Sequence, residues 1–535
     1  EHHSLAIPAG PTIMAASSLV LLQQLLTQQQ WPQLVAILVL PLAFLLLRRQ
    51  LSRSPGGGGL NNKQPPGPWS LPIIGNLHQL GRLPHRSLWA LAQKHGPVML
   101  LRLGMVPVVV LTSPEAARVA LKTHDAECSS RPLLAGPRLL SYGFKDVVFA
   151  PWSDYVREMR KLFVIELLSA RRVQTAYHAR DTQIDKLVAK LSAAARPVRL
   201  EEHVFDTMDR IVGLFVFGES YAGEQFKGEF VPLLNETMDM LSSFSAEDFF
   251  PNAAGRLIDR LTGIKARREA VFHKLDRFYE HIIQQNDMRK ATAAGGGSDL
   301  VQELVDLMKT SPTFTRDNVK SILMNTFIGS IDTTSLTIIW AMSELIRNPR
   351  VLRKAQQEIR SAAAAGGGRG GRVYQPDMPK MRYLRMVVSE TLRLHPPATL
   401  LVPRETMRPF QVDGYDIPAK TRVMVNAWAI SRDPGVWKQD PEEFNPERFK
   451  DADVDFNGSH FEFIPFGAGR RICPGLAMGV ANVEYILANL LYCFDWELPK
   501  GHEVVSVEEV GAFTFRKKTP LVLLPKRYHH HAQDE

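Results

Sequence analysis

Cysteine is scarce in this chain, which has three cysteines among 535 residues. Cys128, Cys473 and Cys493 lie far apart, and no two of them form a C-x-x-C pair. So few cysteines in a long chain are typical of a reducing compartment, where disulfides rarely persist. We expect Cys128 and Cys493 to be packing residues, because cysteine behaves as a small hydrophobic side chain. Cys473 needs another explanation, because it stands in a peptide rich in glycine and arginine.

The sequence also lacks features that mark several other protein classes. It has no repeat with a period of about 20–50 residues, which argues against a solenoid. Its net charge is +9, but Lys and Arg are spread along the chain without a long basic block or an interleaved aromatic strip. This pattern disfavours a nucleic-acid-binding protein. A basic surface that faces anionic lipid or an acidic protein partner fits it better.

Charged residues are absent from Leu5 to Leu47. Within this stretch Trp31–Leu47 is apolar almost throughout, and as a helix it would span roughly 26 Å, close to the thickness of a membrane's hydrocarbon core. Arg48 and Arg49 follow the apolar run, which places the rest of the chain in the cytosol. A cleaved secretory signal is the alternative. It fits less well, because the basic residues come after the apolar run and not before it.

Glycine and proline mark the boundary between this anchor and the body of the protein. Ser54–Pro68 has the composition of a flexible glycine-rich segment that runs into a stiff proline turn. We therefore predict a membrane anchor and linker at residues 1–64 and one large domain at residues 65–535.

The body is predicted to be mainly α-helical with small β-sheets. Runs rich in β-formers around glycine turns predict hairpins at Val98–Ser113 and Phe410–Asn426, the second with Asp413–Gly414 at its turn. One long helix is predicted from about Val319 to Arg347, with Thr315 as its N-cap. Its middle is apolar nearly all round, so this helix should cross the core.

A group of polar residues interrupts the apolar middle of that helix: Ser330, Asp332, Thr333, Thr334 and Ser335. A buried carboxylate is costly unless it has partners or a raised pKa. The hydroxyls and the carboxylate could simply bond neighbouring carbonyls, which is a structural role. The presence of a cysteine-containing glycine loop elsewhere in the chain favours a functional role instead.

That loop reads "FGAGRRICPG" and extends from Phe466 to Gly475. Nearby cations favour a thiolate, so we expect Arg470 and Arg471 to lower the pKa of Cys473. A thiolate is either a nucleophile or a metal ligand, and the loop alone does not distinguish the two.

A second group of charges stands in "SETLRLHPP", where Glu390 and Arg393 lie three residues apart on one helix face. Such a pair on a solvated helix contributes well under about 1 kcal/mol. The surrounding sequence is rich in apolar residues, so the pair is expected to be buried and to need a further partner. Arg448 in "FNPERF" is the candidate, and a network of Glu390, Arg393 and Arg448 would fasten the cysteine loop to the core.

Taken together, these motifs resemble those of the cytochrome P450 superfamily. Phe466, Gly469, Arg471, Cys473 and Gly475 match its haem-binding signature F-x-x-G-x-R-x-C-x-G. The E-x-x-R pair, the "PERF" peptide and the polar segment of the long helix match three further motifs in the right order. The resemblance extends from Pro65 to about Pro525 and implies the cytochrome P450 fold with one haem-thiolate catalytic domain.

The resemblance assigns roles around haem b (iron protoporphyrin IX). Cys473 would be the axial ligand of the iron, and its electron donation would favour O–O cleavage. Arg471 would pair with a haem propionate, with Arg160 and Arg404 as further candidates. Phe466 would pack near the ligand loop.

Across the haem, Asp332 and Thr333 would relay protons during oxygen activation. Glu390, Arg393 and Arg448 would be structural. The chain has no G-x-G-x-x-G after a strand and no other flavin or nicotinamide fingerprint. Electrons from NADPH would therefore come from a separate cytochrome P450 reductase, and O₂ would be the oxidant.

The proline turn after an apolar anchor resembles the microsomal plant members, which implies a single-pass protein of the endoplasmic reticulum membrane with its catalytic domain in the cytosol. Phe244–Leu257, Thr326–Thr333 and Glu390–Met407 resemble the oxime-metabolising plant branch. Its members convert an aldoxime, such as 4-hydroxyphenylacetaldehyde oxime, to a nitrile and then to an α-hydroxynitrile in cyanogenic glucoside biosynthesis.

Three alternatives stay open. One is hydroxylation of another small aromatic or terpenoid specialised metabolite. Another is a haem-thiolate enzyme that rearranges or dehydrates its substrate without net oxygen insertion. The third is a non-catalytic, membrane-tethered haem protein, which the retention of Asp332 and Thr333 disfavours, because a carrier needs no proton relay.

Two positions depart from the family pattern. Ser330 stands where the family usually has glycine, so we expect its bulk or hydroxyl to alter the placement of O₂ or substrate. Val156 replaces a tryptophan that usually faces a haem propionate, so one propionate contact is expected to be missing.

Overall fold

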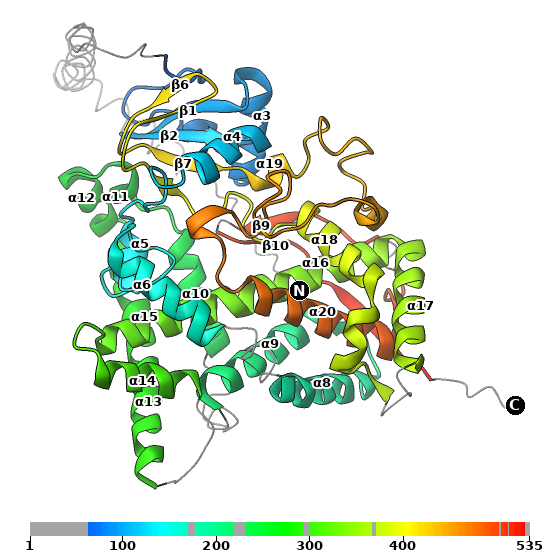
Figure 1. The fold of residues 1–535 in the computed structure, drawn as a ribbon. Helices are drawn as coiled ribbons and strands as arrows, with labels where there is room; N and C mark the ends of the chain where they lie inside the picture. Colours follow the sequence, from blue (N-terminus) through cyan, green and yellow to red (C-terminus); the bar gives the residue numbers. More distant parts are fainter. Residues whose placement is uncertain are drawn as a thin grey trace, which may run out of the picture. The chain divides into compact units, whose positions relative to one another are not determined.

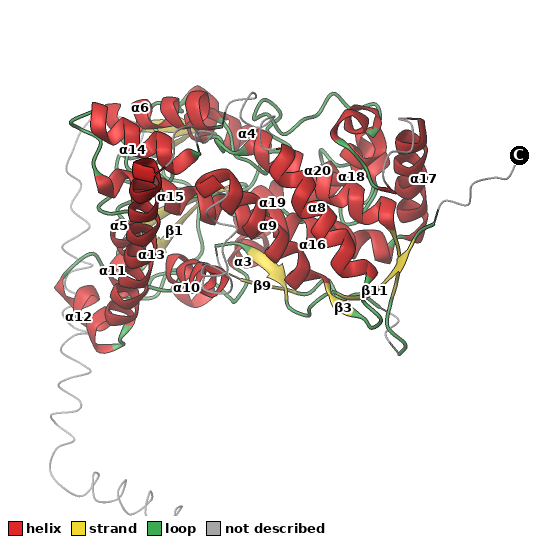
Figure 2. Ribbon diagram, turned by 90° about the horizontal axis from the view of Figure 1, so that it is seen from below, coloured by secondary structure: helices red, strands yellow, loops and turns green. Residues whose placement is uncertain are grey.

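The computed structural model describes residues 63–168, 177–218, 230–292, 299–365, 371–501, 504–511 and 513–529. The chain separates into two units, Glu1–Asn61 and Asn62–Glu535, and everything below concerns the second. The predicted membrane anchor lies outside the described residues and stays a prediction. The described body is mainly helical with small sheets, as the sequence predicted (Figures 1 and 2).

The largest sheet has four strands in the order β1–β2–β7–β4, and its bounds are β1 (Val98–Leu103), β2 (Val106–Leu111), β7 (Arg422–Val425) and β4 (Arg404–Glu405). β1 and β2 form the predicted antiparallel hairpin. Gly104 at its turn has a φ of 62°, and a Cβ there would lie 2.6 Å from the carbonyl oxygen of Phe249. Glycine is therefore required at this turn.

The second predicted hairpin is present in a shorter form. β5 (Phe410–Val412) pairs with β6 (Tyr415–Ile417), and Asp413 and Gly414 between them both have positive φ, as a tight Asp-Gly turn requires. The remaining strand of the segment, β7, instead pairs in parallel with β2. The sequence pattern therefore predicted the Asp-Gly turn correctly, but it did not predict that the last strand pairs with β2.

The long helix is present, and Thr315 caps it as predicted. The backbone N–H of Thr315 donates to the side chain of Asn318 at 2.8 Å, which completes a capping box. The helix begins at Arg316 and has three parts: α15 (Arg316–Phe327), a π-helical turn η6 (Ile328–Asp332) and α16 (Thr333–Arg347). The sequence did not predict the π-turn. It coincides with the polar segment, and such bulges occur often at functional sites.

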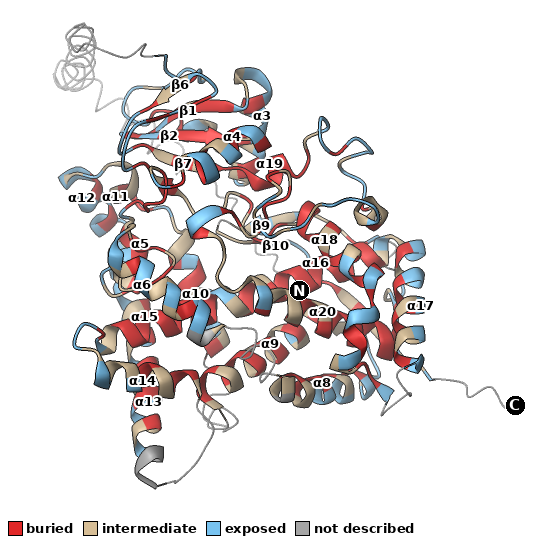
Figure 3. Ribbon diagram, viewed as in Figure 1, coloured by how far each residue is buried: buried red, intermediate tan, exposed pale blue. Residues whose placement is uncertain are grey.

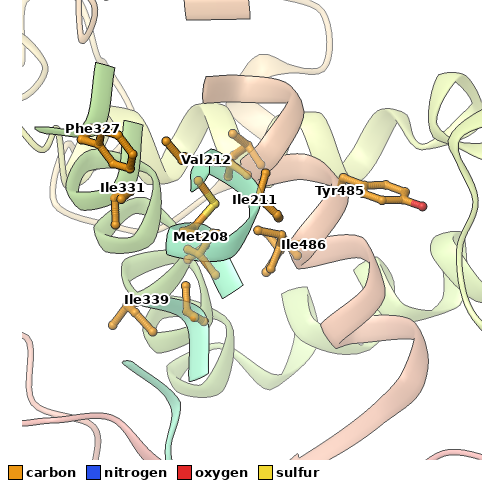
Figure 4. Close-up of a cluster of buried hydrophobic side chains, with 14 of the residues drawn as sticks. Met208, Ile211, Val212, Phe327, Ile331, Ile339, Tyr485 and Ile486 are labelled. Atoms are coloured by element: carbon orange, nitrogen blue, oxygen red, sulfur yellow. The ribbon is translucent and has the colours of Figure 1, made fainter. Parts of the chain in front are cut away.

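The core is built around this helix, α9 (Leu200–Phe217) and α20 (Leu476–Cys493). Figure 4 shows α9 contributing side chains that pack between those of the long helix and α20. Buried surface of this kind stabilises the fold by about 25 cal/mol per Å² of apolar area. The residues in this contact that are almost fully buried include Met208, Ile211, Val212, Phe327, Ile331, Ile339 and Ile486.

The other elements surround this centre. The smaller sheets are β3 (Val198–Arg199) with β11 (Val522–Arg527) and β8 (Phe494–Glu497), and β9 (Glu509–Gly511) with β10 (Phe515–Lys517). The remaining helices are α3 (Pro84–His95), α4 (Pro114–Arg118), α5 (Ala135–Leu140), α6 (Asp154–Leu162), α8 (Tyr177–Ser192), α10 (Phe230–Ser242), α11 (Ala246–Phe249), α12 (Ala253–Leu261), α13 (Ile264–Thr292), α14 (Leu300–Thr310), α17 (Pro349–Ala365), α18 (Arg382–Leu394) and α19 (Ala427–Ile430).

Two helices of the described part are long and apolar enough to cross a membrane, Arg316–Arg347 and Leu476–Cys493. Most of the apolar stretch of each is buried in the body, and Figure 3 shows α16 and α20 largely buried while α12 and α17 present exposed faces. Their hydrophobicity is therefore explained by the protein core.

The predicted charge network joins α18 to the turn η9 (Pro446–Phe449). Arg393 donates two hydrogen bonds to the Glu390 carboxylate, at 2.7 and 2.8 Å, and both side chains are fully buried. Arg448 in η9 donates to the same carboxylate at 3.0 Å. Arg393 also donates to the carbonyl oxygens of Ser431, Pro441 and Glu443, so the network holds the segment that precedes the cysteine loop.

Removing one member of this network should strongly destabilise the body. Arg393→Ala leaves the Glu390 carboxylate in the core with one cation fewer, and breaking a buried pair costs about 3–5 kcal/mol. Arg199→Ala is the matched control, because Arg199 pairs with Glu202 at the same spacing on an exposed surface and should change stability by less than about 1 kcal/mol. Urea unfolding checks both, and equal midpoints for the two variants would show that the buried pair does not support the fold.

Candidate haem-thiolate site

The cysteine loop holds Cys473 between a helical turn and the start of α20. The backbone N–H of Cys473 donates to the carbonyl of Phe466 at 2.9 Å, which closes the loop. Gly469 has a φ of 67°, and a Cβ there would lie 2.2 Å from the carbonyl oxygen of Leu121. Glycine is therefore the residue that lets this loop pack against the neighbouring chain. The Cys473 side chain is partly buried and lines a cavity.

This cavity has a volume of about 1470 Å³, including the space at its mouth. Cys473 and Phe466 line it from the cysteine loop, and Gly329 and Thr333 line it from the long helix. The structure therefore brings the predicted cysteine loop and the polar segment of the long helix to one cavity.

Four arginines also line the cavity: Arg131, Arg160, Arg404 and Arg471. Burial, and then the charges of Arg160 and Arg404, lower the pKa of Arg471 to about 9. Burial is also the main cause that lowers the pKa of Arg131 and Arg160, and neighbouring arginines add to it. Mutual repulsion of this kind is relieved by an anion bound among the guanidinium groups. The two propionates of haem b fit this donor set.

The hydrogen bonds of the arginines show which protein groups each guanidinium contacts. Arg160 donates to the carbonyl of Ile472, next to the cysteine, at 2.6 Å. Arg404 donates to Asp125 and to the carbonyl of Ala468, both at 2.7 Å.

Arg471 donates to the carbonyls of Ser129 and Ala150, so its pairing with a propionate stays a prediction. Arg131 was missed from the sequence, because a single arginine in "SSRPLL" carries no spacing signal. Its side chain donates to the carbonyls of Val148, Val402 and Pro403.

The expectation that Arg470 and Arg471 lower the pKa of Cys473 is wrong. Burial raises the pKa of this thiol, while the Gly475 N–H and the charge of Arg160 act in the opposite direction. The guanidinium of Arg470 instead faces Asp125. A thiol that its surroundings keep protonated is a poor free nucleophile, but a metal ion deprotonates a coordinating thiol outright. The environment of Cys473 therefore fits an axial ligand better than a nucleophile.

Asp332 and Thr333 occupy different places. Thr333 lines the cavity, and its hydroxyl donates to the carbonyl of Gly329 at 2.5 Å across the π-turn. Asp332 is buried and does not line the cavity; burial raises its pKa, while a hydrogen bond from Thr514 and the charge of Arg516 lower it. One carboxylate oxygen of Asp332, Oδ2, has no protein partner. The two residues thus combine a hydroxyl at the cavity with a proton-binding group behind it.

The structure shows where the two departures from the family pattern lie. Gly329 lines the cavity and Ser330 does not, and the expected effect of Ser330 on O₂ or substrate stays a prediction. A Cβ built on Gly329 meets no atom within 4 Å, which leaves open space there. Val156 is fully buried on α6. The indole of Trp152, just before this helix, lies 5.3 Å from the guanidinium of Arg471.

The remaining predicted residues are placed as follows. Phe466 packs against Phe456 with ring centroids 5.5 Å apart, beside the ligand loop. Cys128 and Cys493 are buried and free, which confirms their packing role. Burial raises the pKa of Cys128 to about 11.

Replacing the axial cysteine should remove its spectroscopic signature. Cys473→Ser should lose the long-wavelength Soret band of a thiolate-ligated ferrous–CO haem, because an alcohol does not replace a thiolate in donating charge to iron. Cys493→Ser is the control, since Cys493 is buried outside the cavity lining, and it should keep the band. A Cys473→Ser protein that keeps the band would exclude this cysteine as the ligand.

The arginine cluster should hold the haem carboxylates. Arg160→Leu removes a charged donor at the cavity, and such hydrogen bonds contribute about 1.5–3 kcal/mol, so haem dissociation should accelerate about 10- to 100-fold. Arg157→Leu removes an exposed arginine from the same helix and should leave the rate unchanged. Transfer of haem to an excess of a scavenging protein measures both rates. Equal rates for the two variants would contradict the role of Arg160.

The chain is similar to known proteins over most of its length. The family model described as Cytochrome P450 matches residues 65–524. A 4-hydroxyphenylacetaldehyde oxime monooxygenase of Sorghum bicolor is 56% identical, over 94% of this chain and 96% of that protein. A 2-methylbutanal oxime monooxygenase of Manihot esculenta is 48% identical, over 93% of this chain and 97% of that protein.

Among solved structures, a zebrafish cytochrome P450 with abiraterone superposes with a TM-score of 0.69 at 22% identity, covering 84% of this chain and all of that one. At this identity the likeness shows the fold alone. With the family match, the sequence relatives and the cysteine-centred cavity, the chain belongs to the cytochrome P450 family, as a plant-type haem b monooxygenase that uses O₂ and NADPH-derived electrons delivered by a reductase.

Proposed function

We propose that this enzyme converts an aldoxime, such as 4-hydroxyphenylacetaldehyde oxime, to a nitrile and then to an α-hydroxynitrile, a reaction sequence of cyanogenic glucoside biosynthesis. The observation that carries the proposal is that two relatives at 56% and 48% identity, each matched over most of its length, are both oxime monooxygenases. One acts on an aryl and the other on an aliphatic oxime, so the oxime group is what their substrates share.

The two steps make different demands on the protein. In the first, R–CH₂–CH=N–OH loses water to give R–CH₂–C≡N, with no net oxidation. In the second, the nitrile, O₂, two electrons and two protons give R–CH(OH)–C≡N and water. Electrons and protons from outside are therefore consumed only in the second step.

The haem, when bound, would supply the iron for both steps and the redox chemistry for the hydroxylation. Cys473 would hold the iron, and Arg160, Arg404 and Arg131 would hold the propionates through charge-assisted hydrogen bonds. The apolar part of the lining, which includes Ile328, would exclude water and orient the aromatic ring of the substrate.

Asp332 in the π-turn and Thr333 directly after it would supply the protons. The raised pKa of Asp332 keeps its carboxyl protonated to a higher pH than an ordinary aspartic acid, so it can hold a proton in the interior. The Thr333 hydroxyl faces the cavity and now donates to the Gly329 carbonyl, and rotation about its Cα–Cβ bond would direct that hydrogen to the substrate side. This arrangement supports hydroxylation and is not required for dehydration.

The experiment is turnover of 4-hydroxyphenylacetaldehyde oxime and 2-methylbutanal oxime by the holoenzyme with a plant reductase and NADPH, with both products followed by mass. Wild type should form the nitrile and the α-hydroxynitrile. Thr333→Ala should slow hydroxylation about 100-fold and leave dehydration nearly unchanged, because positioned proton transfer contributes about 10²–10⁴-fold. Nitrile should then accumulate.

Thr326→Ala is the matched control. Thr326 lies on α15, its hydroxyl donates to the Ile322 carbonyl at 2.9 Å in the same i,i+4 pattern, and it does not line the cavity. It should leave the product ratio unchanged. Equal loss of both steps in Thr333→Ala would contradict the separate proton role, and failure of wild type to turn over any aldoxime would refute the substrate class.

A further inference from the structure

The carboxylate of Asp125 joins the arginine cluster to the cysteine loop. Asp125 follows the π-helical turn η2 (Val119–Thr123) and is 8% exposed. Its Oδ1 accepts a hydrogen bond from Nη1 of Arg404 at 2.7 Å, and its Oδ2 accepts one from the backbone N–H of Arg470 at 2.8 Å. Each oxygen of one buried side chain therefore contacts a different part of the haem-thiolate site.

Arg404 makes the same connection from the side of the sheet. While Nη1 of Arg404 bonds Asp125, its Nη2 donates to the carbonyl of Ala468 at 2.7 Å. The peptide from Ala468 to Arg470 is thus held at both ends, by Arg404 at the first carbonyl and by Asp125 at the last N–H. Cys473 lies three residues further on. This pair, which we call the Asp125–Arg404 clamp, therefore fixes the start of the loop that presents the thiol.

Gly469, at the centre of the held peptide, makes this close approach possible. Its φ is 67°, and a Cβ built there would lie 2.7 Å from Oδ1 and 2.8 Å from Cγ of Asp125. Any other side chain at this position would push the carboxylate away from the loop. The contact between Asp125 and the loop therefore depends on the glycine.

The charge of Asp125 also matters to the arginine cluster. Among the residues that the structure describes, Arg404 is the one cavity arginine that forms an ion pair with a carboxylate. Arg131, Arg160 and Arg471 donate instead to backbone carbonyls. Burial lowers the pKa of Arg160 and of Arg471, and the charge of Asp125 acts in the opposite direction on both. Asp125 thus supplies a counter-charge that buried guanidinium groups need.

The clamp leaves Arg404 able to bind a further anion. The guanidinium group is planar, so contacts at both Nη atoms determine its orientation. Nε of Arg404 makes no hydrogen bond to any residue in the described part of the chain, and each Nη has a second hydrogen. Arg404 also lines the cavity. Asp125 therefore holds this side chain in place without using all of its donors.

The residues after Asp125 run between the same two elements. The carbonyl of Ser130 accepts from the N–H of Glu405 on β4 at 3.0 Å, and the carbonyl of Ser129 accepts from Nε of Arg471 at 2.8 Å. The segment thus contacts the strand that carries Arg404 and the loop that carries Cys473. These backbone contacts define where the Asp125 carboxylate lies.

We propose that Asp125 is a positioning residue of the haem-thiolate site, which keeps Arg404, a predicted propionate donor, at a fixed separation from the loop of the axial ligand Cys473. The site has to hold haem at two points, its iron and its propionates. A separation that is set before haem binds lowers the cost of ordering both contacts. The role concerns how the protein holds haem and is independent of the substrate.

The rate of haem dissociation from the ferric holoenzyme tests this role. Asp125→Asn keeps the shape and one acceptor oxygen but loses the charge, whereas Asp125→Ala loses both oxygens. Dissociation should accelerate about tenfold in Asp125→Asn and further in Asp125→Ala, measured by transfer of haem to an excess of a scavenging protein. Asp125→Asn fills the same space as wild type, so it provides the test even if Asp125→Ala does not incorporate haem.

Asp181→Asn is the matched control. Asp181 accepts a hydrogen bond from the buried Arg372 at 3.1 Å, and neither residue lines the cavity. This variant should leave the dissociation rate unchanged even where urea unfolding shows lower stability. Equal acceleration in Asp181→Asn and Asp125→Asn would show that general destabilisation releases haem. A slower rate in Asp125→Asn than in wild type would show that Asp125 competes with haem for Arg404. Either result overturns the inference.

Hydrogen exchange of the holoenzyme, followed by mass spectrometry, reports on the loop without any catalytic assay. The Arg470 amide should exchange at least about tenfold faster in Asp125→Asn, because its charged acceptor is lost. The Gly479 amide, which donates to the Gly475 carbonyl at 2.8 Å at the start of α20, is the internal control and should not change. An unchanged Arg470 amide would contradict the contact between Asp125 and the loop.

A double variant tests whether Asp125 acts through Arg404. When Arg404→Leu is already present, adding Asp125→Asn should change the dissociation rate by less than about threefold, because residues that act as one unit do not have additive effects. If the two substitutions instead multiply each other's effects, Asp125 does not act on haem through Arg404, and the inference fails.

Discussion

The gathering of positive charge beside Cys473 is the feature on which the rest of the site depends. Arg131, Arg160, Arg404 and Arg471 all reach one cavity, and burial together with neighbouring guanidinium charges lowers the pKa of three of them, Arg131, Arg160 and Arg471. Without a bound anion, most of their donors are satisfied by backbone carbonyls. A dianionic cofactor neutralises this charge, so binding haem and stabilising the fold are coupled. The thiol follows the same logic, because a metal ion supplies the charge that its surroundings do not.

The π-turn in the long helix carries the second group of site residues. The Thr333 hydroxyl bonds the Gly329 carbonyl at the cavity surface, in the same i,i+4 pattern that Thr326 makes on the regular helix α15, while Asp332 is buried and does not line the cavity. Successive residues of a helix point in different directions, so the hydroxyl and the carboxyl have different surroundings although they are adjacent in sequence. The open space at Gly329 leaves room for a substrate beside them.

Much of this could be predicted from the sequence, because the signals were local. The Thr315 cap, the Asp413–Gly414 turn and the spacing of Glu390 and Arg393 each depend on residues a few positions apart, and the structure contains all three. Features that depend on distant segments were missed. Arg131 reaches the site only because its loop packs against residues 402 and 403, and the pKa of Cys473 depends on burial by the whole fold.

The difference between local and distant interactions also explains why the expected effect of Arg470 and Arg471 on the pKa of Cys473 was wrong. Sequence neighbours in a loop with two glycines of positive φ point in different directions, so Arg470 reaches Asp125 and Arg471 reaches the carbonyls of Ser129 and Ala150. The cation whose charge acts on the thiol is Arg160, more than 300 residues earlier in the chain, which also donates to the Ile472 carbonyl. Proximity in sequence predicts electrostatic influence in a helix, where spacing fixes direction, but not in a loop of this kind.

The catalytic cavity combines a cationic side with an apolar lining. The four arginines fit the haem propionates, which would neutralise much of their charge once bound. The rest of the lining, which includes Ile328, is mostly apolar, and the Thr333 hydroxyl is among its polar groups. A charged molecule would lose its hydration beside that lining without gaining a partner, which is costly in an apolar environment. The cavity therefore favours a neutral molecule over a charged one.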